Sequence, residues 1–392
     1  MYFGGATPWM RWPEQNSTQE EEDKRETLLG GRRGLECLWR EEDASCERAL
    51  ITAVQQTGRF LGPGPDREVL HGKPKYAGGK DHQAIALYTR SSDVVLKEYH
   101  IMSMFTKVDQ NHGLQEKFKI CMKSMVEHAS FRDDEILHFH LVTDESSRAL
   151  GEKLLSAFLS RAAFATKVSL HSAQQLAAQL VPLVQTMQRH FSAGTSSYFG
   201  DSIFFLSVAM HRILPFDVER IILLDLDLKF KTSIRLLFTE FDQFKVNAAI
   251  GIAYEMQPVY RHTLWQYKRE NGGTPVGEPP PHGFPGFNSG VLLLDLNRLR
   301  RSVIYNELLT PAAVELLAEM FHFQGHLGDQ DFFTLVGVVH PELFHVLSCS
   351  WNRQLCTWWR QQGYAAVFDD YFRCNGAVHI YHGNCNTAIP ND

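Results

Sequence analysis

Two aspartates stand directly after a short apolar run near the middle of the chain. Asp225 and Asp227 follow the run 221–224. If that run is a strand, side chains at positions i and i+2 point to the same face, roughly 6 to 7 Å apart. Two carboxylates at that separation repel by on the order of 2 to 3 kcal/mol, and a bound divalent cation offsets this most directly. Capping of a following helix, or an ion pair with Lys229 or Lys231, is the alternative.

A cation held by carboxylates keeps coordination positions open for the phosphate oxygens of a nucleoside diphosphate, and it would stabilise the diphosphate as a leaving group. Near the other end of the chain, His382 follows a short strand-like run and precedes Asn384. This histidine would complete an Asp–Asp–His ligand set, which suits Mn²⁺ better than Ca²⁺ and leaves Mg²⁺ open. One histidine among 18 is, taken alone, more often a surface or packing residue.

Three further polar stretches stand where the pattern predicts burial or a tight turn. They are 288–290, 326–331, and the pair 106–107 that follows the first strand-like run. Each would fit the lining of a sugar-nucleotide pocket. The plainer interpretations are a turn at 288–290 and a helix cap at Asp329, with Asp331 in the first turn.

Four of the seven cysteines lie within the last 44 residues: Cys349, Cys356, Cys374 and Cys385. None of them forms a CxxC pair, so two disulfides in an oxidising compartment fit better than a zinc site, with free buried thiols as the other alternative. Three connectivities are open.

Aromatic side chains are concentrated beside these cysteines. Trp358 and Trp359 adjoin each other, with Trp351 and Tyr364 nearby in the sequence. Such a group is either part of an aromatic core or a surface that stacks on sugar rings or on a protein partner.

These residues need a sheet to position them. Strand-like apolar runs, separated by segments with helical spacing, occur at 101–106, 136–143, 167–170, 221–224, 248–253 and 291–294. Continuous apolar runs of strand length are typical of a sheet covered on both faces. The sequence therefore predicts an α/β fold, with a mostly parallel, Rossmann-like sheet flanked by helices and a ligand crevice at the carboxyl ends of its strands.

The remaining patterns set the domain organisation. Segment 198–214 predicts one buried helix, whereas the glycines and prolines between 255 and 290 predict an irregular loop. Residues 1–98 mix an acidic run with Gly- and Pro-rich stretches and lack apolar periodicity, so we expect a mostly disordered or irregular stem. Residues 99–392 are expected to form a single large catalytic domain.

The composition excludes some classes of function. The 392 residues carry a net charge of −6, which argues against a nucleic-acid binder. No apolar run approaches the roughly 18 to 20 residues of a membrane-spanning helix, so the chain as written is expected to be soluble. The sequence leaves the oligomeric state open, a homodimer included.

Four motifs follow one another along the chain: Asp225-Leu226-Asp227, Phe287-Asn288-Ser289-Gly290-Val291, Gly328-Asp329-Gln330-Asp331 and Tyr381-His382. This order resembles the retaining glycosyltransferases of family 8, which have the GT-A fold. Longer runs such as LDLDLKFKT, PGFNSGV, GHLGDQDFFT and IYHGNCNT are similar to the xyloside α-1,3-xylosyltransferases of that family, over roughly residues 99 to 392.

The resemblance implies a Mn²⁺-dependent, retaining transfer of xylose from UDP-xylose to a xylose-α-1,3-glucose disaccharide on a serine of EGF-like repeats in Notch-type receptors. The implied metal ligands are Asp225, Asp227 and His382. The implied donor-binding residues are Phe105, Thr106, Asp225, Leu226, Asn288, Ser289, Gly290, Gln330 and Asn384. The catalytic candidates are Gln330, Asp329 and Asn288. The acceptor-side candidates are His262, His326, Leu327, Trp358 and Trp359.

The resemblance also implies two disulfides among the four cysteines, and residence in the endoplasmic reticulum or Golgi lumen behind an N-terminal membrane anchor that the chain as written does not show. Many family members end their metal site with HxxGxxKP, whereas here Gly383 follows His382 directly and Asn386 and Thr387 stand near the lysine position. The diphosphate charge must then be met by the cation, backbone amides, Asn384 or a lysine from elsewhere, such as Lys229.

For the mechanism we expect front-face attack, in which the departing phosphate oxygen takes the acceptor proton. Double displacement would need a carboxylate nucleophile, for which Asp329 or Asp331 is a candidate and Gln330 a poor one. Two alternative functions stay open. One is a family 8 transferase that uses UDP-glucose or UDP-glucuronate, and the other is a catalytically silent domain that binds glycans or EGF-like repeats near Trp358.

Overall fold

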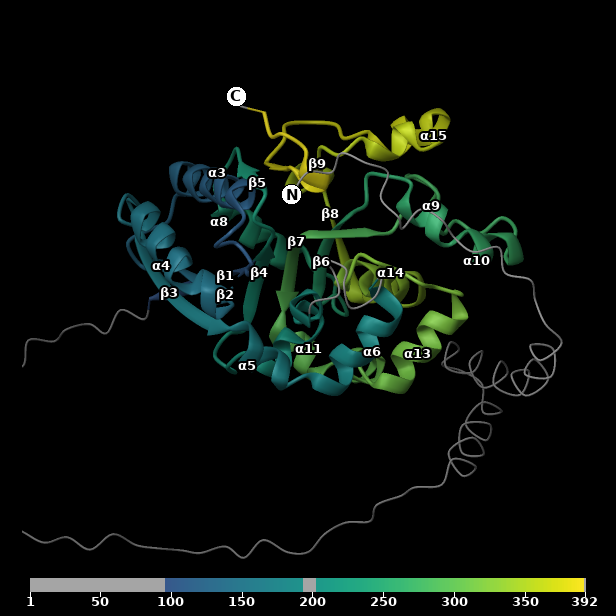
Figure 1. Ribbon diagram of the computed structural model, residues 1–392, viewed down its shortest axis with the longest axis horizontal. Helices are drawn as coiled ribbons and strands as arrows, with labels where there is room; N and C mark the ends of the chain where they lie inside the picture. Colours follow the sequence, from purple (N-terminus) through teal and green to yellow (C-terminus); the bar gives the residue numbers. More distant parts are fainter. Residues whose placement is uncertain (1–95, 193–201, 391–392) are drawn as a thin grey trace, which may run out of the picture. The chain divides into compact units, whose positions relative to one another are not determined.

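The computed structural model describes residues 96–192 and 202–390 (Figure 1). Its main sheet has seven strands in the order β3-β2-β1-β4-β7-β6-β8. The strands are β1 (Lys97–Phe105), β2 (Glu135–Thr143), β3 (Ala165–Ser172), β4 (Arg220–Leu224), β6 (Ile250–Tyr254), β7 (Phe287–Asp295) and β8 (Phe344–Leu347). Strand β7 runs antiparallel to both of its neighbours, and the other pairs are parallel. The predicted α/β fold with a mostly parallel sheet is confirmed.

Helices cover both faces of this sheet because successive residues of each buried strand point to opposite sides. In β4, Ile221 and Leu223 belong to one hydrophobic core, and Ile222 and Leu224 belong to the other. One face carries α3 (His112–His128), α4 (Glu145–Leu159) and α8 (Ile234–Phe238). The other carries α5 (Ala173–Ala178), α6 (Val181–Phe191), α11 (Leu296–Arg301), α12 (Val303–Leu308), α13 (Pro311–Met320) and α14 (Asp329–Val339).

A second, small sheet joins the end of the chain to its middle. It contains β5 (Leu228–Phe230), β10 (Ile380–His382) and β9 (Arg353–Gln354), with β10 in the centre. Residue His382 of β10 pairs with Leu228 of β5 in an antiparallel ladder. The helix α15 (Ala365–Phe372) lies between β9 and β10 in the sequence.

Two local predictions were wrong. Segment 198–214 is not one helix: its described part has 3-10 turns at Ser202–Phe205 and Ser207–Ala209 before the short helix α7 (Met210–Ile213). The predicted burial of this segment is confirmed, since Phe205, Leu206 and Val208 are fully buried. Aromatic and β-branched residues are weak helix formers, and here they pack as a core segment instead.

The predicted loop 255–290 contains two helices, α9 (Val259–Thr263) and α10 (Trp265–Glu270), and β7 begins within it at Phe287. Pro258 stands at the N-cap of α9. A proline at a helix start is tolerated because the first N–H groups of a helix have no partner within it. Gly277 and Gly286 have positive φ and lie so close to α9 that a Cβ atom would collide with Tyr260 or Arg261, which explains the glycines there.

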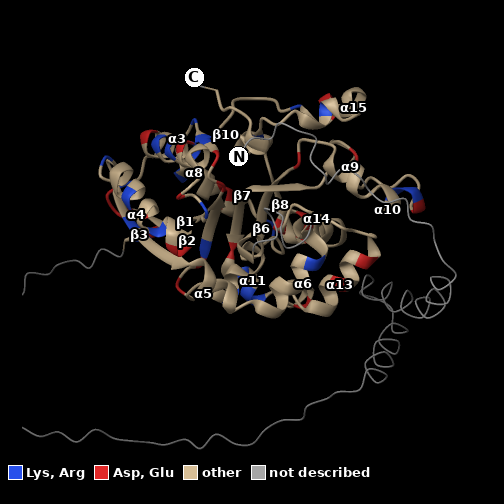
Figure 2. Ribbon diagram, viewed as in Figure 1, with Lys and Arg blue, Asp and Glu red and all other residues tan. Residues whose placement is uncertain are grey.

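The expected stem, residues 1–98, lies outside the described residues apart from 96–98, and β1 begins at Lys97. Within the part of the chain that the structure describes, no helix combines the length and apolar character needed to cross a membrane. Helices α3, α4 and α10 carry both basic and acidic residues (Figure 2), so the charge on these surface helices is mixed.

Candidate functional site

Asp225, Asp227 and His382 converge at the junction of the two sheets. The aspartates lie between the end of β4 and the start of β5, and β10 delivers the histidine. His382 Nε2 is 3.4 Å from Asp225 Oδ2 and 3.3 Å from Asp227 Oδ1, and one ligand atom from each residue lies within 4.8 Å of the others. Gly290 of β7 makes room for the imidazole, because a Cβ there would stand 2.3 Å from His382 Cε1.

The charges of this group compensate one another. Burial alone would raise the pKa of Asp227, but His382 and Lys117 outweigh it and lower that pKa to about 2. Burial alone would lower the pKa of His382, but Asp227 and Asp225 raise it to about 10. The carboxylate of Asp227 is therefore ionised, and the imidazolium of His382 compensates its negative charge.

Lys117 of α3 is a site residue that the sequence reasoning missed. Its Nζ lies 3.3 Å from Asp227 Oδ2 and 3.2 Å from the carbonyl oxygen of Gly383. The sequence reasoning had offered Lys229 as a lysine that could face the diphosphate, but the Nζ of that residue donates to the carbonyl oxygen of Pro390. Lys117 therefore places an ammonium group beside Asp227 and beside the residue that follows His382.

The donor set fits a hard divalent cation. Two carboxylates and one imidazole meet at a single point, and the side chain of Asp225 is 55% exposed whereas that of His382 is 4% exposed. The buried imidazole would fix one side of a cation while the exposed carboxylate leaves the other side open to ligands. A cation must displace the proton of His382 to use its nitrogen.

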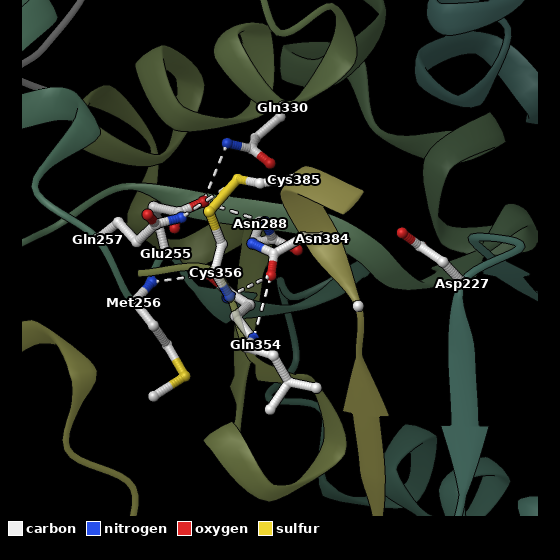
Figure 3. Close-up of a disulfide and its surroundings, with 12 residues drawn as sticks. Asp227, Glu255, Met256, Gln257, Asn288, Gln330, Gln354, Cys356, Asn384 and Cys385 are labelled. Atoms are coloured by element: carbon white, nitrogen blue, oxygen red, sulfur yellow. Dashed lines mark hydrogen bonds between the residues drawn. A yellow bond between two sulfur atoms is a disulfide. The ribbon is translucent and has the colours of Figure 1, made fainter. Parts of the chain in front are cut away.

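A chain of hydrogen bonds leads from His382 to a buried carboxylate. His382 Nδ1 pairs with Asn352 Oδ1 at 2.9 Å, and Asn352 Nδ2 donates to Asn288 Oδ1 at 2.9 Å. Asn288 Nδ2 and Gln330 Nε2 then donate to the same oxygen, Oε2 of Glu255, at 3.0 and 3.3 Å. Figure 3 shows Gln330 and Asn288 directed toward Glu255, with Asp227 further off beyond β10.

Glu255 is the second residue that the sequence reasoning missed. It follows β6 and is 2% exposed, and burial raises its pKa to about 7. Its Oε1 is buried without a hydrogen-bond partner. The sequence signal for it was weak, because Glu255 stands two residues after the strand-like run 248–253 and lacks the second carboxylate that singled out Asp225 and Asp227.

The two aspartates that flank Gln330 both accept hydrogen bonds from neighbouring residues. Asp329 accepts hydrogen bonds from Ser289 Oγ at 3.0 Å and from Ser207, and burial raises its pKa to about 7. Asp331 accepts from the Tyr260 hydroxyl and from the Leu327 amide, each at 2.8 Å. The helix cap is Gly328, and Asp329 and Asp331 both lie in the first turn of α14, so the cap interpretation of Asp329 was wrong and the first-turn position of Asp331 was right.

The other donor-side candidates differ in their surroundings. The turn interpretation of 288–290 was wrong, because Asn288, Ser289 and Gly290 open β7. Phe105 is fully buried against Phe118, with ring centroids 4.8 Å apart, and Leu226 is also buried. The polar group at the end of β1 is Thr106. Asn384 Oδ1 accepts from the amides of Leu355 and Cys356 at 3.1 and 2.9 Å.

Most of the acceptor-side candidates form one partly exposed cluster. His262 Nδ1 pairs with the Tyr364 hydroxyl at 2.8 Å, and its ring lies 5.0 Å from Trp359. Trp358 packs edge to face on Trp359. Burial lowers the pKa of His262, and the charge of His326 acts in the same direction. Trp351 lies elsewhere, buried with its Nε1 donating to Glu240.

The cysteine prediction is confirmed. Cys349 pairs with Cys374, and Cys356 pairs with Cys385, which resolves the three open connectivities. Cys385 stands three residues after His382, and the backbone amide of Cys356 binds Asn384. The second disulfide therefore fastens the segment that carries the histidine.

Known proteins share this architecture. The chain is 54% identical over 323 residues to xyloside xylosyltransferase 1 of Mus musculus, a match that covers 81% of this chain and 82% of that protein. It is 57% identical over 296 residues to the Homo sapiens protein of the same name, covering 75% of each. The crystal structure of mouse xyloside xylosyltransferase 1 in its apo form matches with a TM-score of 0.71 and 56% identity, over 75% of this chain and 100% of that chain. No family model matches the chain.

Proposed function

Because the chain belongs to the xyloside xylosyltransferase family and is a xylosyltransferase with the GT-A fold, we propose that it moves xylose from UDP-xylose to the terminal xylose of a xylose-α-1,3-glucose disaccharide. In this proposal the disaccharide is O-linked to a serine of an EGF-like repeat, and the new linkage is α-1,3. The observation that carries the proposal is the convergence of Asp225, Asp227 and His382 beside the Asn288, Glu255 and Gln330 cluster.

Asp225, Asp227 and His382 would hold a divalent cation, Mn²⁺ by the chemistry of the ligand set, with Mg²⁺ as the other candidate. When bound, the cation would neutralise charge on the diphosphate leaving group. Lys117 adds a positive charge beside Asp227. We assign Thr106, Ser289, Gly290 and Asn384 to the nucleotide sugar, as the family resemblance implies.

Both front-face attack and double displacement retain the α configuration, and the side chains around Gln330 favour front-face attack. Asp329 and Asp331 accept two hydrogen bonds each, so neither is a free nucleophile for double displacement. The acceptor hydroxyl would attack the anomeric carbon on the face from which UDP departs, and the departing phosphate oxygen would take the hydroxyl proton. Asn288 and Gln330, oriented by Glu255, are positioned to bind the transferred sugar.

The aromatic cluster of His262, Trp358, Trp359 and Tyr364 is assigned to the acceptor. A sugar ring presents C–H groups that pack on exposed aromatic faces, and its hydroxyls pair with imidazole nitrogens. The two disulfides require an oxidising compartment, which supports residence in the lumen of the endoplasmic reticulum or Golgi.

Transfer activity with a panel of UDP-sugar donors tests the proposal. The full chain is incubated with UDP-xylose, UDP-glucose or UDP-glucuronate, with Mn²⁺, Mg²⁺ or a chelator, and with or without a xylosyl-glucoside acceptor. We expect a trisaccharide with a xylose-α-1,3-xylose linkage from UDP-xylose alone, and none with the chelator. Transfer from a hexose or glucuronate donor, or acceptor binding without release of UDP, would contradict the proposal.

A further inference from the structure

Four histidines lie on one face of the sheet at its β3 edge, away from the site described above. They are His100 of β1, His138 and His140 of β2, and His171 of β3. His100 pairs in register with His138, and His140 lies two residues further along β2, so all three side chains project from the same face. That face is opposite the one covered by α3 and α4.

The imidazoles of this histidine cluster lie within ligand distance of one another. His100 Nδ1 is 3.0 Å from His140 Nε2, and His140 Nδ1 is 2.9 Å from His171 Nε2. The rings of His138 and His140 stack with centroids 4.1 Å apart. One nitrogen from each of His100, His138 and His140 falls within 4.8 Å of the others, whereas donors around a tetrahedral Zn²⁺ stand about 3.3 Å apart, so modest ring rotations would close the site.

The imidazoles of the cluster are in the protonation state that binds a cation. Burial lowers the pKa of His100 to about 4 and that of His140 to about 2, so both rings are neutral at pH 7, the form in which imidazole coordinates metals. Glu98 Oε2 pairs with His138 Nδ1 at 2.9 Å, and such a carboxylate commonly supports a metal-bound histidine. His138 Nε2 pairs with Ser169 Oγ at 2.8 Å, and a cation would replace this contact.

Charges of both signs act on the cluster. The carboxylates of Glu98 and Asp217 raise the pKa of His100 and His138, and the ammonium group of Lys167, which pairs with Glu98 at 3.1 Å, lowers it. His100 is only half buried, so an ion can approach from that side.

We propose that His100, His138 and His140 form a second cation site, which binds a borderline divalent ion of the Zn²⁺ class. A set of imidazole nitrogens selects Zn²⁺, Cu²⁺ or Ni²⁺ over Mn²⁺ and Mg²⁺, the reverse of the preference of the Asp–Asp–His site. His100 pairs with Ile221, four residues before Asp225, so the two sites are roughly 13 Å apart along β4. The bound ion would cross-link β1 to β2.

Zinc binding to the full chain tests the proposal. The background is Asp225→Asn with Asp227→Asn, which disables the first site, and the protein is treated with an alkylating reagent so that reactive thiols contribute no ligand. We expect calorimetry to find one Zn²⁺ per chain, and His140→Gln in that background to weaken binding by at least about tenfold. The control is His282→Gln, which alters an exposed histidine of the 255–290 segment and should leave the affinity unchanged.

A second measurement keeps the histidines intact, in case the His140 variant does not fold. X-ray absorption of the Zn²⁺-loaded background should give a first shell dominated by imidazole nitrogen, and Zn²⁺ should raise the melting temperature. No Zn²⁺ binding in the background, binding that survives the change at His140, or a shell of oxygen alone would each overturn the proposal.

Discussion

Asp227 is the carboxylate on which the candidate metal site depends most. Its side chain is 18% exposed and contacts both His382 and Lys117, whereas Asp225 is largely exposed. Asp227→Asn keeps the shape and removes the charge. We expect it to lower xylosyl turnover with Mn²⁺ by about 100-fold or more, the usual loss when a charge that stabilises the leaving group is removed. Steady-state rates with UDP-xylose measure this.

The matched control for that change is Asp242→Asn, whose carboxylate is 70% exposed and pairs with Arg220. It should change turnover little. A rate for Asp227→Asn close to that of the control, at saturating Mn²⁺, would remove Asp227 from the ligand set.

Glu255 offers a prediction about positioning. One of its oxygens accepts hydrogen bonds from both Asn288 and Gln330. In Glu255→Gln, the amide oxygen can take the place of Oε2 and accept from both donors without a negative charge, whereas the opposite amide orientation turns an N–H₂ group toward both donors. We expect kcat to fall by roughly 10- to 100-fold, corresponding to about 1.5 to 3 kcal/mol for the weakened hydrogen bonds.

The test of Glu255 includes mass spectrometry of the enzyme during turnover. Retained Mn²⁺ affinity together with a lower kcat would support the positioning role. A covalent xylosyl adduct on Glu255 would contradict it, because the residue would then be the nucleophile of a double displacement.

For single residues, the sequence predicted the site where the partners lie close together in the chain. Asp225 and Asp227 are two residues apart after an apolar run, and this pattern alone predicted convergence. Lys117 lies 110 residues from Asp227 in the sequence, and Glu255 is 75 residues from Gln330. Neither has a nearby partner in the sequence, so only the folded chain identifies them.

Among the elements, the reversal of β7 decides where the polar motif at 288–290 goes. Leu224 of β4 pairs with Val291 of β7, and the amide of Asp225 donates to the carbonyl of Gly290 at 3.0 Å. Because β7 is antiparallel, its beginning lies beside the end of β4. In a fully parallel sheet the same residues would lie at the far edge. The sequence predicted a mostly parallel sheet but gave no sign of which strand was reversed.

The ion pair between β2 and α8 gives a prediction about stability and pH. Arg235 donates to both oxygens of Glu135 at 2.7 and 2.8 Å, and Tyr99 donates at 2.9 Å. Arg235 is the main cause that lowers the pKa of Glu135 to about 2, from an ordinary value of 4.5. A lowered pKa stabilises the fold fully above pH 4.5, and this stabilisation disappears as the pH falls toward 2.

We therefore expect Glu135→Gln to reduce the free energy of unfolding at pH 7 by about 2 kcal/mol, and to flatten its decline between pH 4.5 and 2. Urea unfolding across that pH range measures both. The control is Glu127→Gln, whose carboxylate is 57% exposed beside Lys123. Equal losses of unfolding free energy in the two variants would mean that the buried ion pair of Glu135 stabilises the fold no more than an exposed ion pair does.

Over the whole molecule, the last part of the chain returns to its middle to complete the site. The strand β10 has only three residues and lies between β5 and β9. The short strand-like run before His382 suggested this histidine as a third ligand, but one histidine among 18 is weak evidence alone, and the family resemblance strengthened the expectation that it meets Asp225. The cysteine count suggested two disulfides, but it contained no information on their pairing.

The two disulfides allow a matched test of that arrangement. They close segments of similar length, with separations of 25 and 29 residues, so each should contribute about 3 to 4 kcal/mol by restricting the unfolded chain. Cys385 adjoins Asn384 and follows His382 closely. Cys349 accepts a backbone hydrogen bond from the amide of Asn352.

Cys356→Ser with Cys385→Ser and Cys349→Ser with Cys374→Ser should therefore lose similar amounts of unfolding free energy in urea. At a temperature where circular dichroism shows both variants folded, we expect the first variant to lose Mn²⁺ affinity and xylosyl turnover by at least about tenfold. Without the disulfide, the segment that carries His382 is free to move and must be ordered each time the cation binds, which weakens binding. The second should stay within a few-fold of the parent. Equal loss of Mn²⁺ affinity in both variants would mean that the Cys356–Cys385 bond supports the fold in general and does not hold His382 against the aspartates.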